Sequence, residues 1–135
     1  MKEKVLEALS NMGFQVEERE DGNVYLFTYE GANFLYLHSD DDEDFLNICL
    51  PGIEEIGDNI NRALALMDLI NSRLKFLKAY RMGDSIWLFY ERELLGEDDL
   101  QSIIERMIIR LETGLGQARL IAAEIDKNFS ETYDA

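Results

Sequence analysis

The stretch Phe14 to Tyr36, FQVEEREDGNVYLFTYEGANFLY, carries the pattern that decides the fold. Along it, three short runs place apolar or aromatic side chains at alternate positions: Phe14 and Val16, then Tyr25, Phe27 and Tyr29, then Phe34 and Tyr36. Asp21-Gly22 and Glu30-Gly31 interrupt the runs, and Asp-Gly between alternating runs is typical of a tight hairpin turn. The stretch therefore predicts three antiparallel strands, with Val16 opposite Phe27 and Phe27 opposite Phe34.

The segments on either side extend this pattern. Lys2 to Met12 has apolar residues at helical spacing and is followed by Gly13, a residue suited to a left-handed helix end. A fourth strand, Phe45 to Leu50, is expected beyond the acidic stretch Ser39 to Asp44. We expect it to stop at Pro51-Gly52, because proline interrupts a strand ladder.

Helical spacing returns in the second half of the chain. A helix is predicted behind the capping residues Asp58 and Asn59, ending near Asn71 or Ser72. A hairpin follows, formed by Leu74 to Tyr80 and Ser85 to Arg92. A last helix is expected from Asp98, where Gly114 and Gly116 are expected to bend or break it.

These elements predict one α+β domain over residues 1–127, with a frayed tail over residues 128–135. The expected order is α-β-β-β-β-α-β-β-α, an antiparallel sheet of five to six strands with three helices.

The charge excludes some partners. The chain has 135 residues, and 28 Asp and Glu against 13 Lys and Arg give a net charge of −15. Such a surface repels nucleic acid, which gains affinity from Lys and Arg. One local exception is the set of cations Arg73, Lys75, Lys78 and Arg81, which could contact phosphate or nucleic acid. Such cations also commonly protect a strand edge, or they could complement the acidic loop of the same or a neighbouring chain. No apolar run approaches the roughly 18–20 residues of a membrane helix, so the sequence predicts no membrane contact. A single cysteine cannot form a disulfide within the chain, which favours a cytoplasmic location.

The residues carry no recognisable chemistry. His38 is the only histidine and Cys49 the only cysteine, and Cys49 lies in an apolar run where a buried thiol is the ordinary occupant. The run Asp40 to Asp44 lacks the glycine and glutamate of an EF-hand. We therefore predict no catalytic residue, no metal site and no cofactor.

Both faces of the predicted sheet carry apolar side chains. The alternation that groups the aromatic residues places a second apolar set on the opposite side: Val24, Leu26, Leu35 and Leu37. An antiparallel sheet with one wet face should not be apolar on both sides. Either helices of the same chain cover both faces, or this second set binds a partner.

The segments Asn71 to Tyr80, Gly83 to Leu88 and Glu91 to Leu94 resemble the YbjN family, in the sequence of helix end, strand, Gly-Asp turn, strand and acidic-apolar exit. The order of elements, the size and the acidity also resemble type III secretion chaperones, which share that fold. This resemblance implies a small, acidic, dimeric cytoplasmic protein without enzymatic activity, which holds another polypeptide or regulates through contacts.

The sequence thus favours a non-enzymatic, chaperone-like or regulatory protein-binding module that forms a homodimer or binds a protein client, with Val24, Leu26, Leu35 and Leu37 as the contact residues. The alternative is a small-molecule sensor or enzyme. It would have a pocket between the aromatic side of the sheet and the last helix, lined by Tyr25, Tyr29, Tyr36 and Trp87.

Overall fold

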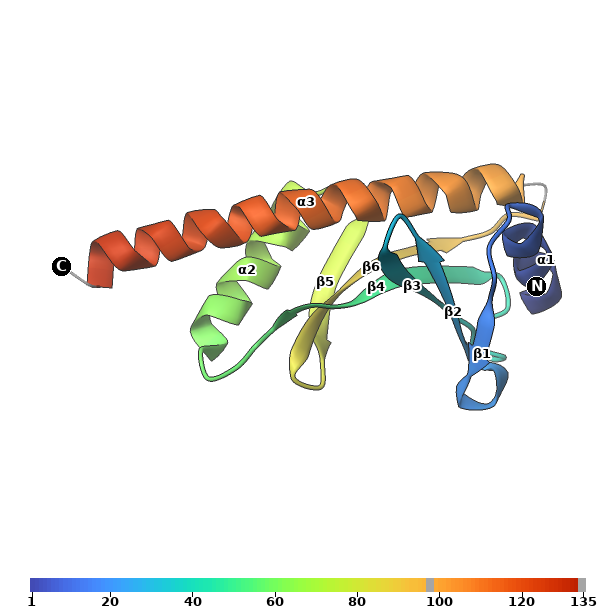
Figure 1. Cartoon of the computed structure of the whole chain (residues 1–135), viewed down its shortest axis with the longest axis horizontal. Helices are drawn as coiled ribbons and strands as arrows, with labels where there is room; N and C mark the ends of the chain where they lie inside the picture. The colour runs from blue at the N-terminus through green and yellow to red at the C-terminus, as the bar shows by residue number, and fades with distance from the viewer. Residues whose placement is uncertain (97–98, 134–135) are drawn as a thin grey trace.

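The computed structural model describes residues 1–96 and 99–133, which form helices packed on one antiparallel sheet (Figure 1). The elements in chain order are α1 (Lys2–Asn11), β1 (Glu17–Arg19), β2 (Val24–Tyr29), β3 (Ala32–Leu37), β4 (Phe45–Glu55), α2 (Ile60–Arg73), β5 (Leu77–Met82), β6 (Ser85–Glu93) and α3 (Leu100–Tyr133). This is the predicted α+β order. The sheet has six strands in the order β1-β2-β3-β4-β6-β5. Asp98, the predicted start of the last helix, lies outside the described residues.

The register of the first hairpins follows from the alternation. Phe27 pairs with Phe34, as expected, and Glu17 pairs with Leu26. The Glu30-Gly31 turn has φ of 48° and 80° at its two residues, the left-handed pair that a two-residue hairpin needs. The first turn is wider than predicted, because residues Glu20–Gly22 form one turn of 3₁₀ helix.

Three expectations about strand limits are wrong. Strand β1 begins only at Glu17, so Phe14 and Val16, which were expected in the first strand, precede it. Strand β4 does not stop at Pro51-Gly52: it continues to Glu55, with a shift in its pairing to β6 between Leu50 and Glu54. An irregularity of this kind is where a proline, which lacks an N–H group, can be placed within a strand. Strand β5 begins at Leu77 and not at Leu74, because Phe76 has a φ of 68°, a left-handed backbone conformation far from that of a regular strand.

The helices lie along one face of the sheet. Figure 1 shows α3 running the length of the molecule above the strands, with α2 beside it at one end and α1 at the other. The main core joins all three helices to one side of the sheet, and its fully buried members include Leu9, Phe27, Phe34, Tyr36, Ile70, Leu88 and Ile104.

Helix α3 is continuous through Gly114 and Gly116, so the predicted break is wrong. Gly114 serves close packing instead. A Cβ atom there would overlap Leu77 Cδ1 and meet Leu88 Cδ2 at 3.5 Å, whereas one at Gly116 would meet nothing within 4 Å. The absent side chain thus lets α3 approach the strands, and packing outweighs the poor helix propensity of glycine. The frayed tail over residues 128–135 stays a prediction.

Side-chain contacts fasten α2 to its neighbours. Arg62 Nη1 donates to Glu54 Oε1 of β4 and Arg62 Nε to Asp126 Oδ1 of α3, both at 2.6 Å. Asn71 donates to the Ala79 carbonyl at 2.9 Å and accepts from the Ala79 N–H at 2.7 Å. Since β5 is an edge strand, Asn71 occupies backbone groups that would otherwise face solvent.

Candidate protein-interaction surfaces

The second sheet face carries an apolar cluster that contains no helical residue. We call it the open face: Leu35, Cys49 and Phe89 are buried at its centre, and Val24, Leu26, Leu37, Tyr80 and Trp87 pack around them, partly exposed. The four contact residues predicted from the sequence, Val24, Leu26, Leu35 and Leu37, all belong to this cluster. The helices of the chain therefore cover one face of the sheet and leave the open face uncovered.

Aromatic stacking explains how Phe89 is fully buried without a covering helix. The Tyr80 ring lies flat on the Phe89 ring, with centroids 4.0 Å apart and planes 2° from parallel. Trp87 pairs with Tyr80 across the two strands and lies 6.1 Å from Phe89 between ring centroids. The rings of Tyr80 and Trp87 thus form an apolar platform that is exposed in part to solvent.

A polar group borders this platform. Lys78 Nζ lies 3.1 Å from Glu91 Oε2 and 4.9 Å from the Tyr80 ring centroid. Burial, and then the charge of Glu91, raises the pKa of Tyr80 to about 12. Beside it, Asn47 Nδ2 donates to Glu91 Oε1 at 3.4 Å. The Asn47 Oδ1 atom is buried and accepts no hydrogen bond from the described residues.

The aromatic pocket of the alternative function is not formed. Tyr25 and Tyr36 stack with centroids 5.8 Å apart, and both are buried in the main core. Trp87 lies on the open face, on the other side of the sheet. Tyr29 lines a separate small cavity of about 290 Å³ near the start of α3. Alternation along the strands places Trp87 on the opposite face of the sheet from Tyr25 and Tyr36. The sequence alone does not show this, because it does not give the register of β6 relative to β2 and β3.

The His38 ring is held by side-chain contacts, and Cys49 is buried. The His38 ring is 3.3 Å from the Tyr36 hydroxyl at Nδ1 and 2.9 Å from Asp40 Oδ1 at Nε2. Cys49 is fully buried, and burial raises the pKa of its thiol to about 12. At neutral pH this thiol is therefore protonated and weakly nucleophilic.

The four cations singled out in the sequence do not stay together. Lys78 points to the open face and pairs with Glu91, while Arg81 bonds the Gly83 carbonyl at the tip of the β5-β6 hairpin. Only Arg73 and Lys75 line a groove, which has a volume of about 700 Å³ and lies between α3 and the link from α2 to β5.

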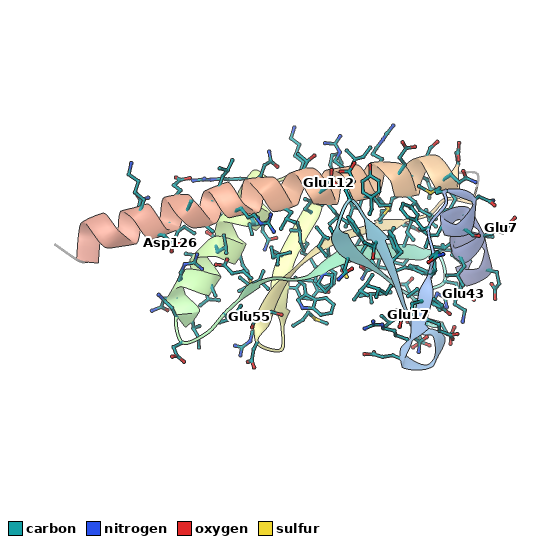
Figure 2. The ribbon with its side chains drawn as sticks, viewed as in Figure 1. Glu7, Glu17, Glu43, Glu55, Glu112 and Asp126 are labelled. Carbon is teal, nitrogen blue, oxygen red and sulfur yellow. The ribbon has the colours of Figure 1, made fainter. Side chains whose placement is uncertain are left out.

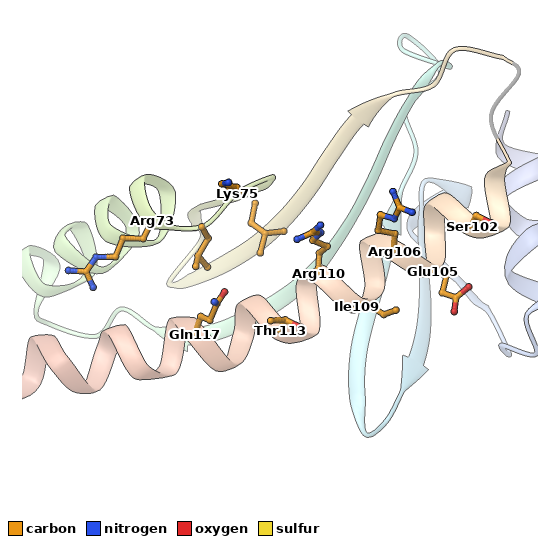
Figure 3. A pocket seen from close by; sticks show the side chains of 11 residues that line it. Arg73, Lys75, Ser102, Glu105, Arg106, Ile109, Arg110, Thr113 and Gln117 are labelled. Carbon is orange, nitrogen blue, oxygen red and sulfur yellow. The ribbon is translucent and has the colours of Figure 1, made fainter.

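Helix α3 supplies the other wall of this basic groove, including two arginines that the sequence analysis missed. Arg106 and Arg110 extend from the same side of α3, whereas Glu105 extends from the other (Figure 3). Among the residues described, the lining thus holds four cations and one carboxylate. One signal could have identified them: Ile109, between the two arginines, is apolar yet lies outside the buried stripe of its helix.

The groove also has apolar surface. Ile109 is 50% exposed, and Leu74 and Leu77 line the opposite wall. Phe76, next to it, is 58% exposed, with Arg110 4.9 Å above its ring and the Tyr90 ring stacked on it. The left-handed backbone at Phe76 costs about 1–3 kcal/mol, and such strain is concentrated at functional sites.

The rest of the surface is dominated by carboxylates. Figure 2 labels acidic side chains on α1, β1, the β3-β4 loop, β4 and α3, spread over the whole molecule. In the described part of the chain, no group of three or more His, Cys, Asp or Glu side chains is placed to hold a metal ion. No described helix has an apolar stretch long enough to cross a membrane.

Comparison with known proteins rests on structure. The chain matches no family profile and no curated protein sequence. Its structure is similar to that of YbjN from E. coli, for which a role as a transcription regulator has been proposed, with a TM-score of 0.65. The match covers 89% of this chain and 92% of YbjN at 10% sequence identity. At that identity the likeness concerns the fold alone, and it confirms the fold that the sequence resemblance implied: this chain has a YbjN-like fold.

Proposed function

We propose that this protein is a non-enzymatic, chaperone-like or regulatory module of the cytoplasm that forms a homodimer through the open face. The observation that carries the proposal is the apolar cluster of β2, β3, β4, β5 and β6, which none of the described helices covers. Partly exposed apolar side chains gathered on one sheet face are typical of an interaction surface. A second copy of the chain would cover this cluster as one sheet packs on another in a β-sandwich.

The unpartnered Asn47 Oδ1 adds support. A buried acceptor without a donor costs about 1–3 kcal/mol, and rotation of the Asn47 side chain towards a donor of a docked chain would remove that cost. Asn47 lies directly between Leu37 and Glu91 in the sheet register, at the margin of the apolar cluster. A partner that covers the cluster would therefore also reach Asn47.

The charges at the ends of the sheet favour one orientation. One cross-strand row starts at an acid on β1 and ends at a base on β5: Glu17, Leu26, Leu35, Cys49, Phe89 and Lys78. The next row starts at Arg19 and ends at Glu91. A twofold axis parallel to the strands would bring each end over the opposite end of the second copy, so that unlike charges meet.

The chemistry of the described residues agrees with a role in binding. The Cys49 thiol is buried with a raised pKa, and the His38 ring is held by Tyr36 and Asp40. For regulation, the net charge of −15 favours contact with a protein partner over direct contact with DNA.

Light scattering coupled to size exclusion tests the proposal. We expect twice the monomer mass for the wild type and a folded monomer for Leu26→Asp, Leu35→Asp, because two carboxylates would be buried in the interface. The matched control Leu64→Asp, Leu120→Asp adds the same charge at exposed positions of α2 and α3, and should remain dimeric.

A wild type that is monomeric at all concentrations would overturn the proposal. So would two variants whose dimers have the same dissociation constant. If circular dichroism shows that the double variant is unfolded, Leu26→Asp alone decides the matter, because Leu26 is more exposed than Leu35.

A further inference from the structure

The basic groove on the helical side of the molecule is independent of the open face. It is formed where α3 passes the link between α2 and β5, and Arg73, Lys75, Arg106 and Arg110 line it. A protein with a net charge of −15 gathers four of its 13 basic residues here. We propose that this groove binds an acidic, extended polypeptide segment of a partner protein, which carries apolar side chains as well as carboxylates.

The cations are available to a ligand. Within the described residues, Lys75, Arg106 and Arg110 make no ion pair, and Arg110 lies over the face of the Phe76 ring. Arg73 is the exception, because its guanidinium lies 3.0 Å from Glu124. An anion can therefore bind at Lys75, Arg106 and Arg110 without breaking an internal ion pair.

The apolar lining selects a peptide over a nucleic acid. Ile109 is half exposed, and Leu74 and Leu77 face it across the groove. A phosphate backbone would leave the exposed part of Ile109 without apolar contacts, and its neighbouring phosphates would meet carboxylates such as Glu105 and Glu124. A peptide with mixed acidic and apolar side chains satisfies both kinds of surface.

The dimensions indicate how the peptide lies. Ser102 to Gln117 spans about 22 Å along the helix axis, which an extended peptide covers with about six or seven residues. The peptide cannot add to the sheet at the middle of β5, because Asn71 already bonds both backbone groups of Ala79. It therefore lies along α3 and is held by side chains.

The chain's own acidic stretch is a poor occupant. Ser39 to Asp44 reads SDDDED, which contains no apolar residue for Ile109 and Leu74 to contact. A second copy docking by this stretch would use only the cations. The groove thus points to a different polypeptide as its source of carboxylates.

Selection from a displayed library of random peptides of about twelve residues, long enough to span the groove, tests the proposal. We expect the immobilised full chain to enrich peptides that combine Asp or Glu with apolar residues. Lys75→Glu, Arg106→Glu should weaken the enriched peptide about tenfold, as measured by fluorescence anisotropy. The matched control Arg119→Glu, Lys127→Glu reverses two exposed charges of α3 outside the groove and should change affinity less than about twofold.

Three outcomes would overturn the proposal. One is enrichment without acidic residues, or none at all. Another is an equal loss of affinity in both charge-reversal variants, which would assign the effect to net charge. The third is tighter binding of single-stranded DNA, or of a synthetic SDDDED peptide, than of the selected peptide. These experiments measure peptide binding on the helical side of the molecule. A negative result would therefore not bear on the proposed homodimer at the open face.

Discussion

At the scale of single residues, Gly114 and Gly116 show the same residue type in two roles. Both lie in α3, but only Gly114 faces the strands, where a side chain would press on Leu77. The first glycine therefore sets how closely the helix approaches the sheet, and the second is a helix position without that constraint.

Alanine substitution at each glycine separates these roles. Gly114→Ala should lower the free energy of unfolding by about 1–3 kcal/mol, because the core must shift to admit the methyl group. Gly116→Ala should raise it by about 0.5–1 kcal/mol through better helix propensity. Urea unfolding followed by circular dichroism measures both. Stabilisation by Gly114→Ala would show that Leu77 moves aside without cost.

The open face and the basic groove differ in how far the sequence predicts their residues. The open-face leucines were found by alternation alone, since alternate residues of a strand share a face. Arg106 and Arg110 were missed because charged residues on a helix are ordinarily solvated. Only their position opposite Lys75, which depends on how α3 packs, makes them part of a groove.

At the scale of elements, Arg62 joins α2 to β4 and α3. Its side chain is 20% exposed and donates to Glu54 and Asp126. Hydrogen bonding to Arg62 lowers the pKa of Asp126. A lowered carboxyl pKa means that this pair stabilises the fold above the ordinary pKa of aspartate, and that the stabilisation is lost as pH falls through the lowered value.

Replacing Arg62 tests this fastening. Arg62→Met should lower the free energy of unfolding at neutral pH by about 1–2 kcal/mol, because hydrogen bonds to two carboxylates are lost. The control Arg73→Met removes an exposed pair with Glu124 and should cost less. Denaturant unfolding at several pH values measures both. The difference between wild type and Arg62→Met should shrink towards acid pH, and a difference that grows there would contradict the lowered pKa of Asp126.

The order of elements was predictable where hydrophobic period and turn chemistry agree. The Glu30-Gly31 hairpin and the Asn59 cap of α2 were both expected, and the Asn59 side chain does accept from the Arg62 N–H. The continuation of β4 past Pro51 and the unbroken α3 depend on tertiary partners, β6 and Leu77. Local propensity cannot report those.

At the scale of the whole molecule, acidity opposes compactness. A net charge of −15 on 135 residues produces self-repulsion, and added salt screens exposed charges within a Debye length of about 10 Å at 0.1 M. The helices must therefore be held to the sheet against a repulsive surface.

Thermal unfolding at two ionic strengths measures that repulsion. We expect the midpoint to rise by a few degrees between about 20 mM and about 500 mM sodium chloride, because the repulsion between carboxylates is screened. Potassium chloride should give the same rise if the effect is screening. A fall in the midpoint would mean that attractive pairs such as Arg62 with Asp126 outweigh the repulsion.

The two hydrogen bonds between Asn71 and Ala79 have a consequence for how copies of the chain can assemble. Ala79 is occupied on one border of the sheet, and the strand on the other border, β1, has only three residues. Both features disfavour edge-to-edge pairing of strands between molecules. In crowded solution this protein should thus resist forming filaments by strand addition.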